Sequence, residues 1–224
     1  MAISGSQTAG TVPDRSLTGT PMSQTVPTVT GPSSAVEVPL VADPAPLGLV
    51  AFGMTTLVLS AINAGWISAA ATPAVLALAI PFGGGGQLLA GMWEFRRGNT
   101  FAATAFTSFG AFWISYFLLV QYFLPAIKDP KALTAVLGTY LIAWGIFTAY
   151  MFVASLGGSR AVQVVFLLLT LTFVALAIGA WTNDPKTVWT NIGGYLGLAT
   201  AVAALYTSFA DVTNANFKRK ILPT

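Results

Sequence analysis

The chain has 224 residues, of which 55% are hydrophobic and 8% are charged, whereas a soluble domain carries about 25% charged residues. It contains no cysteine and no histidine, which excludes a disulfide framework, thiolate or imidazole catalysis and the usual Cys/His metal sites. Without these groups no familiar catalytic set can be assembled, so neither an enzyme nor a cofactor or metal is expected. The composition indicates an integral membrane protein, and no basic stripe with interleaved aromatics suggests nucleic acid as a partner.

Residues 1–42 differ in composition from the rest of the chain. They are rich in Thr, Ser, Pro and Gly, and Leu17 and Leu40 are their only leucines. Such a segment buries too little apolar surface to offset its chain entropy. It also lacks the basic start and apolar centre of a signal peptide. We therefore expect a disordered cytoplasmic tail, and we expect the first helix to act as the insertion signal.

Six stretches long enough to cross a membrane follow this tail. No charged residue stands between Asp43 and Glu94, and this segment holds two predicted helices with a turn near residues 71–73. Each further charge-free stretch exceeds the about 20 residues that a spanning helix needs; these stretches are residues 98–127, 132–159, 161–183 and 187–210. The expected fold class is all-α, with a six-helix membrane domain over residues 43–213 and a basic cytoplasmic end over residues 214–224.

The cationic residues fall mostly on one side of the predicted helices. If the N-terminus lies inside the cell, the inner side receives Arg15, Arg96, Arg97, Arg160, Lys218, Arg219 and Lys220. The outer side then receives only Lys128, Lys131 and Lys186. Because cytoplasmic loops carry an excess of Lys and Arg, both termini are predicted to be cytoplasmic. The protein is expected in the cell (plasma or inner) membrane, as a multi-pass protein in contact with membrane lipid.

Residues 82–116 combine four consecutive glycines, a glutamine, a charge cluster and a Gly-Asn-Thr sequence. We interpret this stretch as two membrane helices that meet at a short polar turn. The glycines at 83–86 and 91, with Ala90, and the glycines at 193, 194 and 197 leave helix faces with almost no side chain, which permits close helix packing in lipid. Two interpretations stay open: these glycines serve as helix contacts within or between subunits, or they also leave room beside a pore.

Polar side chains within the predicted spans mark a possible pathway, because each costs free energy unless it finds a partner or water. Asn63 and Gln87 are amides, and either an interhelical hydrogen bond or a pathway lining is open for both. A hydroxyl such as Thr107 can instead bond to its own helix. No charged residue lies in the middle of a predicted span, unlike the relay of an ion pump. The route therefore suits a small neutral or weakly charged solute, or an anion attracted by backbone dipoles.

Three acidic residues lie near the ends of the spans, namely Asp43, Glu94 and Asp211, and they are the candidates for proton coupling. Arg97 follows Glu94 by three residues, so an interfacial ion pair is the alternative role for Glu94. Asp43 directly precedes Pro44, where a carboxylate caps the start of a helix whose exposed amides can bind an anion.

Two motifs give the chain a family resemblance. DPAPLGLVAFGMTT at residues 43–56 and GGGGQLLAGMWEFRRGNTFAATAFTSFGAFW at residues 83–113 closely resemble the acetate uptake transporter family, also called the GPR1/FUN34/YaaH family. The resemblance covers about residues 43–222. It includes the closing motif formed here by Asn214, Phe217, Leu222 and Pro223.

This resemblance implies a function, an assembly and site residues. The family takes up acetate and related short monocarboxylates, in some members succinate, and is described as proton-linked or channel-like. It implies a six-helix bundle assembled as a hexamer in which each subunit holds its own pore. By motif position, the narrow point of that pore falls on Phe52, Phe109 and Leu169. Three apolar side chains at one level resist wetting and slow a hydrated ion, whereas Gln87, Asn63 and Thr107 are candidates for hydrogen bonds to a carboxyl end.

The chain departs from the family pattern at two positions. Asp43 replaces an asparagine, which adds negative charge at the predicted cytoplasmic mouth and weakens anion binding there. Phe109 stands where a tyrosine is common, which removes a hydroxyl from the narrow point.

Two other functions are alternatives to carboxylate transport. A general small-solute channel shares a charge-poor, hydroxyl-lined interior, but such folds contain internal repeats, and the central motif is not repeated in the second half of this chain. A non-transporting acetate or ammonium sensor would use the long tail and the basic end instead.

Overall fold

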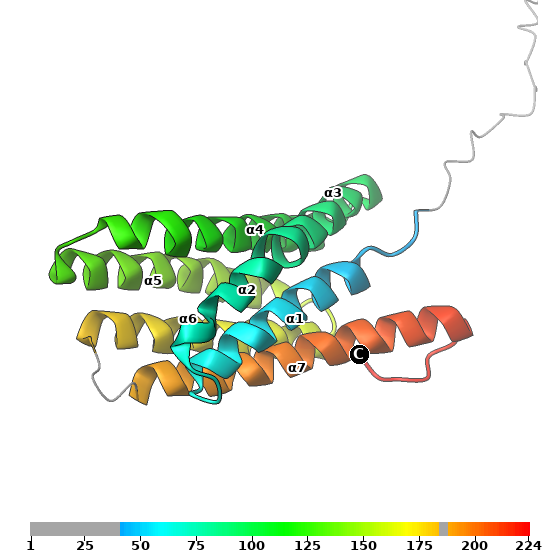
Figure 1. Ribbon diagram of the computed structural model, residues 1–224. Helices are drawn as coiled ribbons and strands as arrows, with labels where there is room; N and C mark the ends of the chain where they lie inside the picture. The colour runs from blue at the N-terminus through cyan, green and yellow to red at the C-terminus, as the bar shows by residue number, and fades with distance from the viewer. Residues whose placement is uncertain (1–40, 184–187) are drawn as a thin grey trace, which may run out of the picture. The chain divides into compact units, whose positions relative to one another are not determined.

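The computed structural model describes residues 41–183 and 188–224. The tail predicted over residues 1–42 therefore lies almost wholly outside the described residues, as do Asp184 and Lys186 of a predicted outer loop. The regular elements of the described residues are all helices, without a strand, and six of these helical segments are long and apolar enough to cross a membrane. This confirms the predicted all-α membrane fold with six spans (Figure 1).

The six spans follow the chain in order. The first is α1 (Ala45–Asn63), and the second joins η1 (Ala69–Ala71), α2 (Thr72–Leu78), the π-helix η2 (Ala79–Gly86) and α3 (Gln87–Arg97). The third joins α4 (Thr100–Leu118), η3 (Leu119–Phe123) and η4 (Leu124–Ala126). The last three are α5 (Pro130–Ser155), α6 (Arg160–Thr182) and α7 (Val188–Phe217).

The first turn lies earlier than the sequence suggested. The helix α1 ends at Asn63, and Gly65 takes a left-handed conformation with φ +77°. Pro73, which the sequence placed in the turn, instead lies in the first turn of α2. Proline is favoured there because its missing N–H has no partner within the helix.

Side-chain caps fix where several helices begin. Asp43 Oδ1 accepts a hydrogen bond from the Ala45 N–H (3.0 Å), directly before α1. Asn99 Oδ1 accepts from the Ala102 N–H (3.2 Å) at the start of α4, and Ser159 Oγ accepts from the Val162 N–H (3.3 Å) at the start of α6.

Gly98 ends α3 with φ +76°, a conformation that costs glycine little. The predicted polar turn between residues 97 and 100 is thus confirmed.

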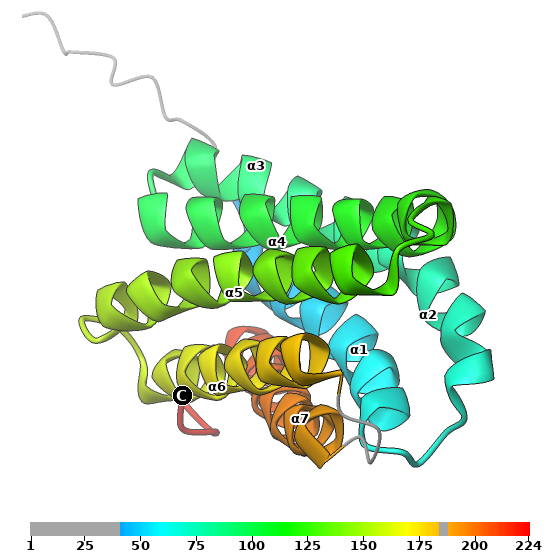
Figure 2. The ribbon, with the colours of Figure 1, turned by 90° about the vertical axis from the view of Figure 1, so that its left-hand side faces the viewer.

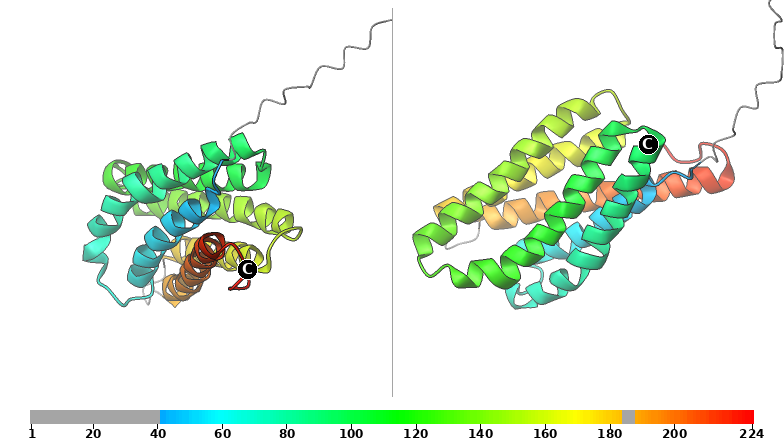
Figure 3. Two further views of the ribbon diagram at one scale, coloured as in Figure 1. Left: turned by 90° about the vertical axis from the view of Figure 1, so that its right-hand side faces the viewer. Right: turned by 90° about the horizontal axis from the view of Figure 1, so that it is seen from above.

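The spans form a ring. The helix α7 packs against α1 on one side and α6 on the other, α6 packs against α5, and α3 packs against both α4 and α1 (Figures 2 and 3). The backbones of α4 and α5 come close at few points, and aromatic side chains such as Phe112 and Trp144 join these two helices. The start of α1, the α3–α4 turn, the α5–α6 loop and the end of α7 lie at the same end of the ring (Figure 1). We call this the α1-start end.

Glycines allow the closest helix contacts. A Cβ at Gly194 of α7 would overlap the backbone of Asn63 and Ala64 at the end of α1, and a Cβ at Gly91 of α3 would overlap Thr107 of α4. These glycines therefore act as contacts between helices of one subunit, one of the two interpretations left open by the sequence.

Candidate functional site

Two cavities lie within the ring of spans, each with a volume of about 470 Å³. The first cavity is at the α1-start end, where Ala45, Asn99, Ser159 and Asp211 are among its lining residues. The second cavity is at the opposite end, where its lining includes Asn63, Leu124 and Asn183. Phe52 and Leu169 line both cavities, so these two residues stand where the cavities meet.

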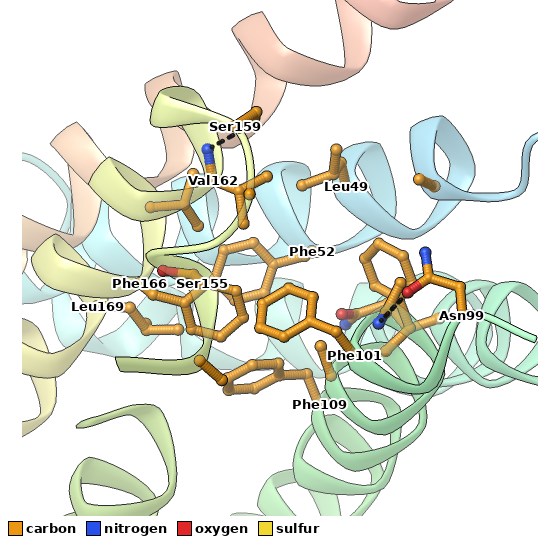
Figure 4. Close-up of a pocket in the computed structure, with 18 of the residues that line it drawn as sticks. Leu49, Phe52, Asn99, Phe101, Phe109, Ser155, Ser159, Val162, Phe166 and Leu169 are labelled. Carbon is orange, nitrogen blue, oxygen red and sulfur yellow. Dashed lines mark hydrogen bonds between the residues drawn. The ribbon is translucent and has the colours of Figure 1, made fainter. Parts of the chain in front are cut away.

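Three buried apolar side chains separate the cavities. Phe52, Phe109 and Leu169 expose 5%, 3% and 4% of their surface, and they come from α1, α4 and α6. The ring centroids of Phe52 and Phe109 are 5.6 Å apart, and Figure 4 shows all three side chains beside the first cavity. These are the three side chains that the family resemblance implied for the narrow point, and we call them the apolar barrier.

A shell of aromatic side chains surrounds this barrier. The shell was not predicted from the sequence. Phe109 lies 6.1 Å from Phe166, 6.2 Å from Trp144 and 5.2 Å from Phe147, measured between ring centroids. Phe166 is three residues before Leu169, and this spacing places both on one face of α6. The three-residue spacing could therefore have identified Phe166 from the sequence. Trp144 and Phe147 could be identified only from the tertiary structure, because α5 carries many apolar side chains and their spacing does not single out these two.

The first cavity contains one buried amide. Gln87 is completely buried, and its Nε2 donates to the Gly83 carbonyl oxygen at 2.7 Å. The opposite amide orientation would place two oxygens together, so this bond fixes which atom is Oε1. Oε1 has no hydrogen-bond partner, although Gln87 lines the cavity. A solute with an acidic O–H would satisfy it. Asp211, on α7, lines the same cavity.

The second cavity contains unpartnered polar groups of its own. The Thr56 hydroxyl and the Trp113 indole nitrogen are buried without a hydrogen-bond partner, and both residues line this cavity. Asn63 lines it as well. Phe52, Thr56 and Asn63 follow one another at intervals of four and seven residues, which places them on one face of α1. Thr56 and Trp113 were not predicted from the sequence as lining residues. The four-residue spacing between Phe52 and Thr56 could have identified Thr56.

Other predicted site residues lie outside both cavities. Thr107 packs against Gly91 of α3 with its Oγ1 buried and unpartnered, and it is in neither lining, in contrast to the prediction. Asp43 is also in neither lining, because its carboxylate turns to Arg97. Arg97 Nη1 lies 2.6 Å from Asp43 Oδ1 and 3.6 Å from Glu94 Oε2. Glu94 is completely buried and makes the ion pair that was its alternative role.

Comparisons with known proteins agree with the geometry. Residues 27–223 match the GPR1/FUN34/yaaH family. The chain is 41% identical to the succinate-acetate/proton symporter SatP of Escherichia coli K12, over 81% of this chain and 94% of that protein. It is 39% identical to acetate permease A of Emericella nidulans, over 84% of this chain and 67% of that protein.

A solved structure gives the same result for the fold. The structure titled "Structure of the bacterial acetate channel SatP" superposes with a TM-score of 0.75 at 39% sequence identity. The match covers 82% of this chain and 99% of that chain. All three similar proteins are named for transport or for a channel, and with six apolar spans this is a multi-pass membrane protein. The chain belongs to the GPR1/FUN34/yaaH family.

Proposed function

We propose that this chain transports acetate and related short carboxylates across the cell membrane. The observation that carries the proposal is the pair of cavities that meet at Phe52 and Leu169. A pathway closed by side chains, and not by backbone, needs only small side-chain movements to pass a small solute. The names of the similar proteins, which refer to acetate and in one case to succinate, support the solute class.

The barrier favours a solute with one apolar end. A hydrated inorganic ion would have to lose water between Phe52, Phe109 and Leu169, where no polar group replaces that water. A short carboxylic acid presents a methyl group to the same side chains at little cost. Gln87 on one side of the barrier and Asn63 on the other are the proposed hydrogen-bonding partners of its carboxyl group, since each lines a cavity.

Proton linkage is proposed for Asp211, the only acidic residue among the described residues that line the first cavity. Glu94 and Arg97 are the weaker candidates, because both are engaged in the ion-pair cluster with Asp43. The proton can cross on the carboxylic acid itself or on Asp211, and in both cases one carboxylate and one proton are transported. Asp211 would therefore affect the pH dependence of uptake more than the identity of the solute.

The membrane orientation follows from the cationic residues. Arg96, Arg97, Arg160 and Lys218 stand at the α1-start end, which supports placing this end, both termini and the first cavity on the cytoplasmic side of the plasma or inner membrane. The resemblance to the family supports a hexamer with one pore in each subunit. Large apolar side chains on the outer faces of the helices, such as Trp93 and Phe209, are exposed for contact with lipid or a neighbouring subunit.

The proposal is tested by uptake of radiolabelled acetate into liposomes that hold the purified protein, with a pH gradient imposed and the membrane potential clamped. Protein-free liposomes run in parallel, because the neutral acid crosses lipid unaided. We expect protein-dependent uptake that falls at least about tenfold in Gln87→Ala, a loss of roughly 1.4 kcal/mol. Phe52→Ala removes part of the barrier, and we expect it to change uptake by a similar factor and to weaken the discrimination against a hydrated ion. Phe123→Ala is the matched control, because Phe123 is 60% exposed and lines neither cavity.

The extent of acetate accumulation distinguishes coupled transport from a channel and from a sensor. Transient accumulation above the level of passive weak-acid distribution indicates a coupled driving force, whereas equilibration to that level indicates a channel. Absence of protein-dependent flux of acetate, succinate and lactate would overturn the proposal and favour the sensor function.

A further inference from the structure

The mouth of the first cavity is acidic. Asp211 is the only charged residue among the described residues of its lining. Ser208, one turn before Asp211 on α7, donates from Oγ to the Pro46 carbonyl oxygen at 2.7 Å and so ties α7 to the start of α1. This contact holds the last part of α7 against the start of α1, where Asp43 Oδ1 accepts from the Ala45 N–H. Two carboxylates from distant parts of the sequence therefore lie at the α1-start end, and that of Asp211 lines the cavity.

The basic residue beside Asp43 is Arg97, and its charge is already paired with carboxylates. Arg97 is one-third exposed and contacts two carboxylates, Asp43 at 2.6 Å and Glu94 at 3.6 Å. The other basic residues that the structure describes at this end are exposed and absent from the cavity lining, namely Arg96, Arg160, Lys218, Arg219 and Lys220. No described cation thus lines the cavity, and the Asp43–Arg97 ion pair holds the charge of Arg97 on a carboxylate outside the lining.

The number of charges on the solute then decides how strongly this mouth disfavours it. A monocarboxylic acid enters with one charge or none, whereas a dicarboxylate such as succinate carries two negative charges at neutral pH. One unit charge acting on another at roughly 10 Å changes an equilibrium about two- to sixteenfold, for effective dielectric constants between those of water and a protein surface. Adding or removing one charge at the mouth should therefore change the selectivity several-fold.

We propose that the Asp43–Arg97 ion pair and Asp211 determine the charge selectivity of this chain, so that it favours monocarboxylates over dicarboxylate dianions. This inference rests on the proposed carboxylate transport. It makes Asp43 a specificity-determining residue, which acts through the charge that it cancels on Arg97 and not through contact with the barrier.

The test measures acetate and succinate uptake together in the same proteoliposomes at neutral pH, with two isotopes, so that each sample gives a succinate-to-acetate ratio. Asp43→Asn keeps an oxygen that can cap α1 and releases Arg97, and we expect it to raise the ratio about three- to fivefold. Asp211→Asn should raise the ratio by a similar factor. Arg97→Gln breaks the same ion pair but leaves Asp43 unpaired, and we expect it to lower the ratio.

The opposite directions expected for Asp43→Asn and Arg97→Gln separate charge from structure, since both variants lose the same contact. A shift in the same direction for both, or ratios equal to that of the unsubstituted protein while acetate uptake persists, would overturn the inference. If Asp43→Asn does not insert into membranes, Asp43→Ser and Asp211→Asn provide the same comparison. Absence of acetate uptake by the unsubstituted protein would instead overturn carboxylate transport itself.

Discussion

Phe109 illustrates how much of the pathway depends on single side chains. Its ring lies within 6.2 Å of the rings of Phe52, Trp144, Phe147 and Phe166, measured between centroids, and it is 3% exposed. Every one of these neighbours is aromatic, and only Trp144 carries a polar group, its indole N–H. Under the proposed transport, a crossing solute would find little to replace lost water here, and this one position would control how polar a solute the barrier tolerates.

Phe109→Tyr should change the solute preference. The added hydroxyl would be buried among aromatic rings, where an unpaired polar group costs about 1–3 kcal/mol, so it will recruit water or the solute's carboxyl group. We expect the uptake of succinate relative to propionate to rise about three- to tenfold, measured with acetate as the reference solute. Phe123→Tyr, at an exposed position, should leave the ratios unchanged. Equal uptake ratios for acetate, propionate and succinate in Phe109→Tyr and the unsubstituted protein would disprove the expectation.

At the scale of the elements, small residues decide which helices meet. In α7, Gly193 faces Leu176 of α6, Gly194 faces the backbone at the end of α1, and Gly197 faces Ser60 of α1. In the second span, the π-helix η2 contains Gly83, which faces Trp113 and Thr55. In lipid, helices associate through such close packing because the hydrophobic effect does not drive them together.

Gly194→Ala should destabilise the fold. The added Cβ would overlap backbone atoms of Asn63 and Ala64, and the backbone of a helix cannot move aside as a flexible side chain can. Overpacking of this kind costs about 1–3 kcal/mol, so we expect a lower thermal unfolding midpoint in detergent, together with reduced uptake. Gly157→Ala is the matched control for the midpoint alone, because an added Cβ there meets nothing within 4 Å, whereas Gly157 lines the first cavity and so is no control for uptake. A midpoint for Gly194→Ala equal to that of the control would show that α1 and α7 can separate without cost.

At the scale of the whole molecule, the fold places its cationic residues asymmetrically. Lys218, Arg219 and Lys220 follow α7 at the α1-start end. At the opposite end, Lys128 lies between η4 and α5, and Lys131 lies in the first turn of α5. Asn214 fixes the basic end, since its Oδ1 accepts from the Ile221 and Leu222 N–H groups at 2.7 and 2.9 Å.

Single cysteines provide a direct test of orientation, because the chain contains none. We expect a membrane-impermeant maleimide to label Lys128→Cys in intact cells, and to label Lys220→Cys only after the cells are permeabilised. Both positions are exposed, so a difference in labelling reports sidedness. Labelling of Lys220→Cys in intact cells would place the α1-start end outside and reverse the proposed direction of the pathway.

The sequence by itself determined the class, the number of spans and the family. Each charge-free stretch is long enough to cross a bilayer as a helix, and few other structures satisfy the backbone in lipid. The two motifs at residues 43–56 and 83–113 identified the family. It also predicted three side chains that lie together at the barrier. The turn after α1 was placed too late, because Pro73 marks the start of a helix as readily as a turn.

Only the tertiary structure decided which polar residues line the cavities. Thr107 and Thr56 are both hydroxyls within spans, yet Thr107 packs against a glycine and Thr56 lines a cavity. The Asp43–Arg97 ion pair joins residues 54 positions apart, and its acidic neighbour Asp211 comes from the last helix. Helical periodicity fixes which residues share a face, but the direction in which that face points depends on how all six spans pack.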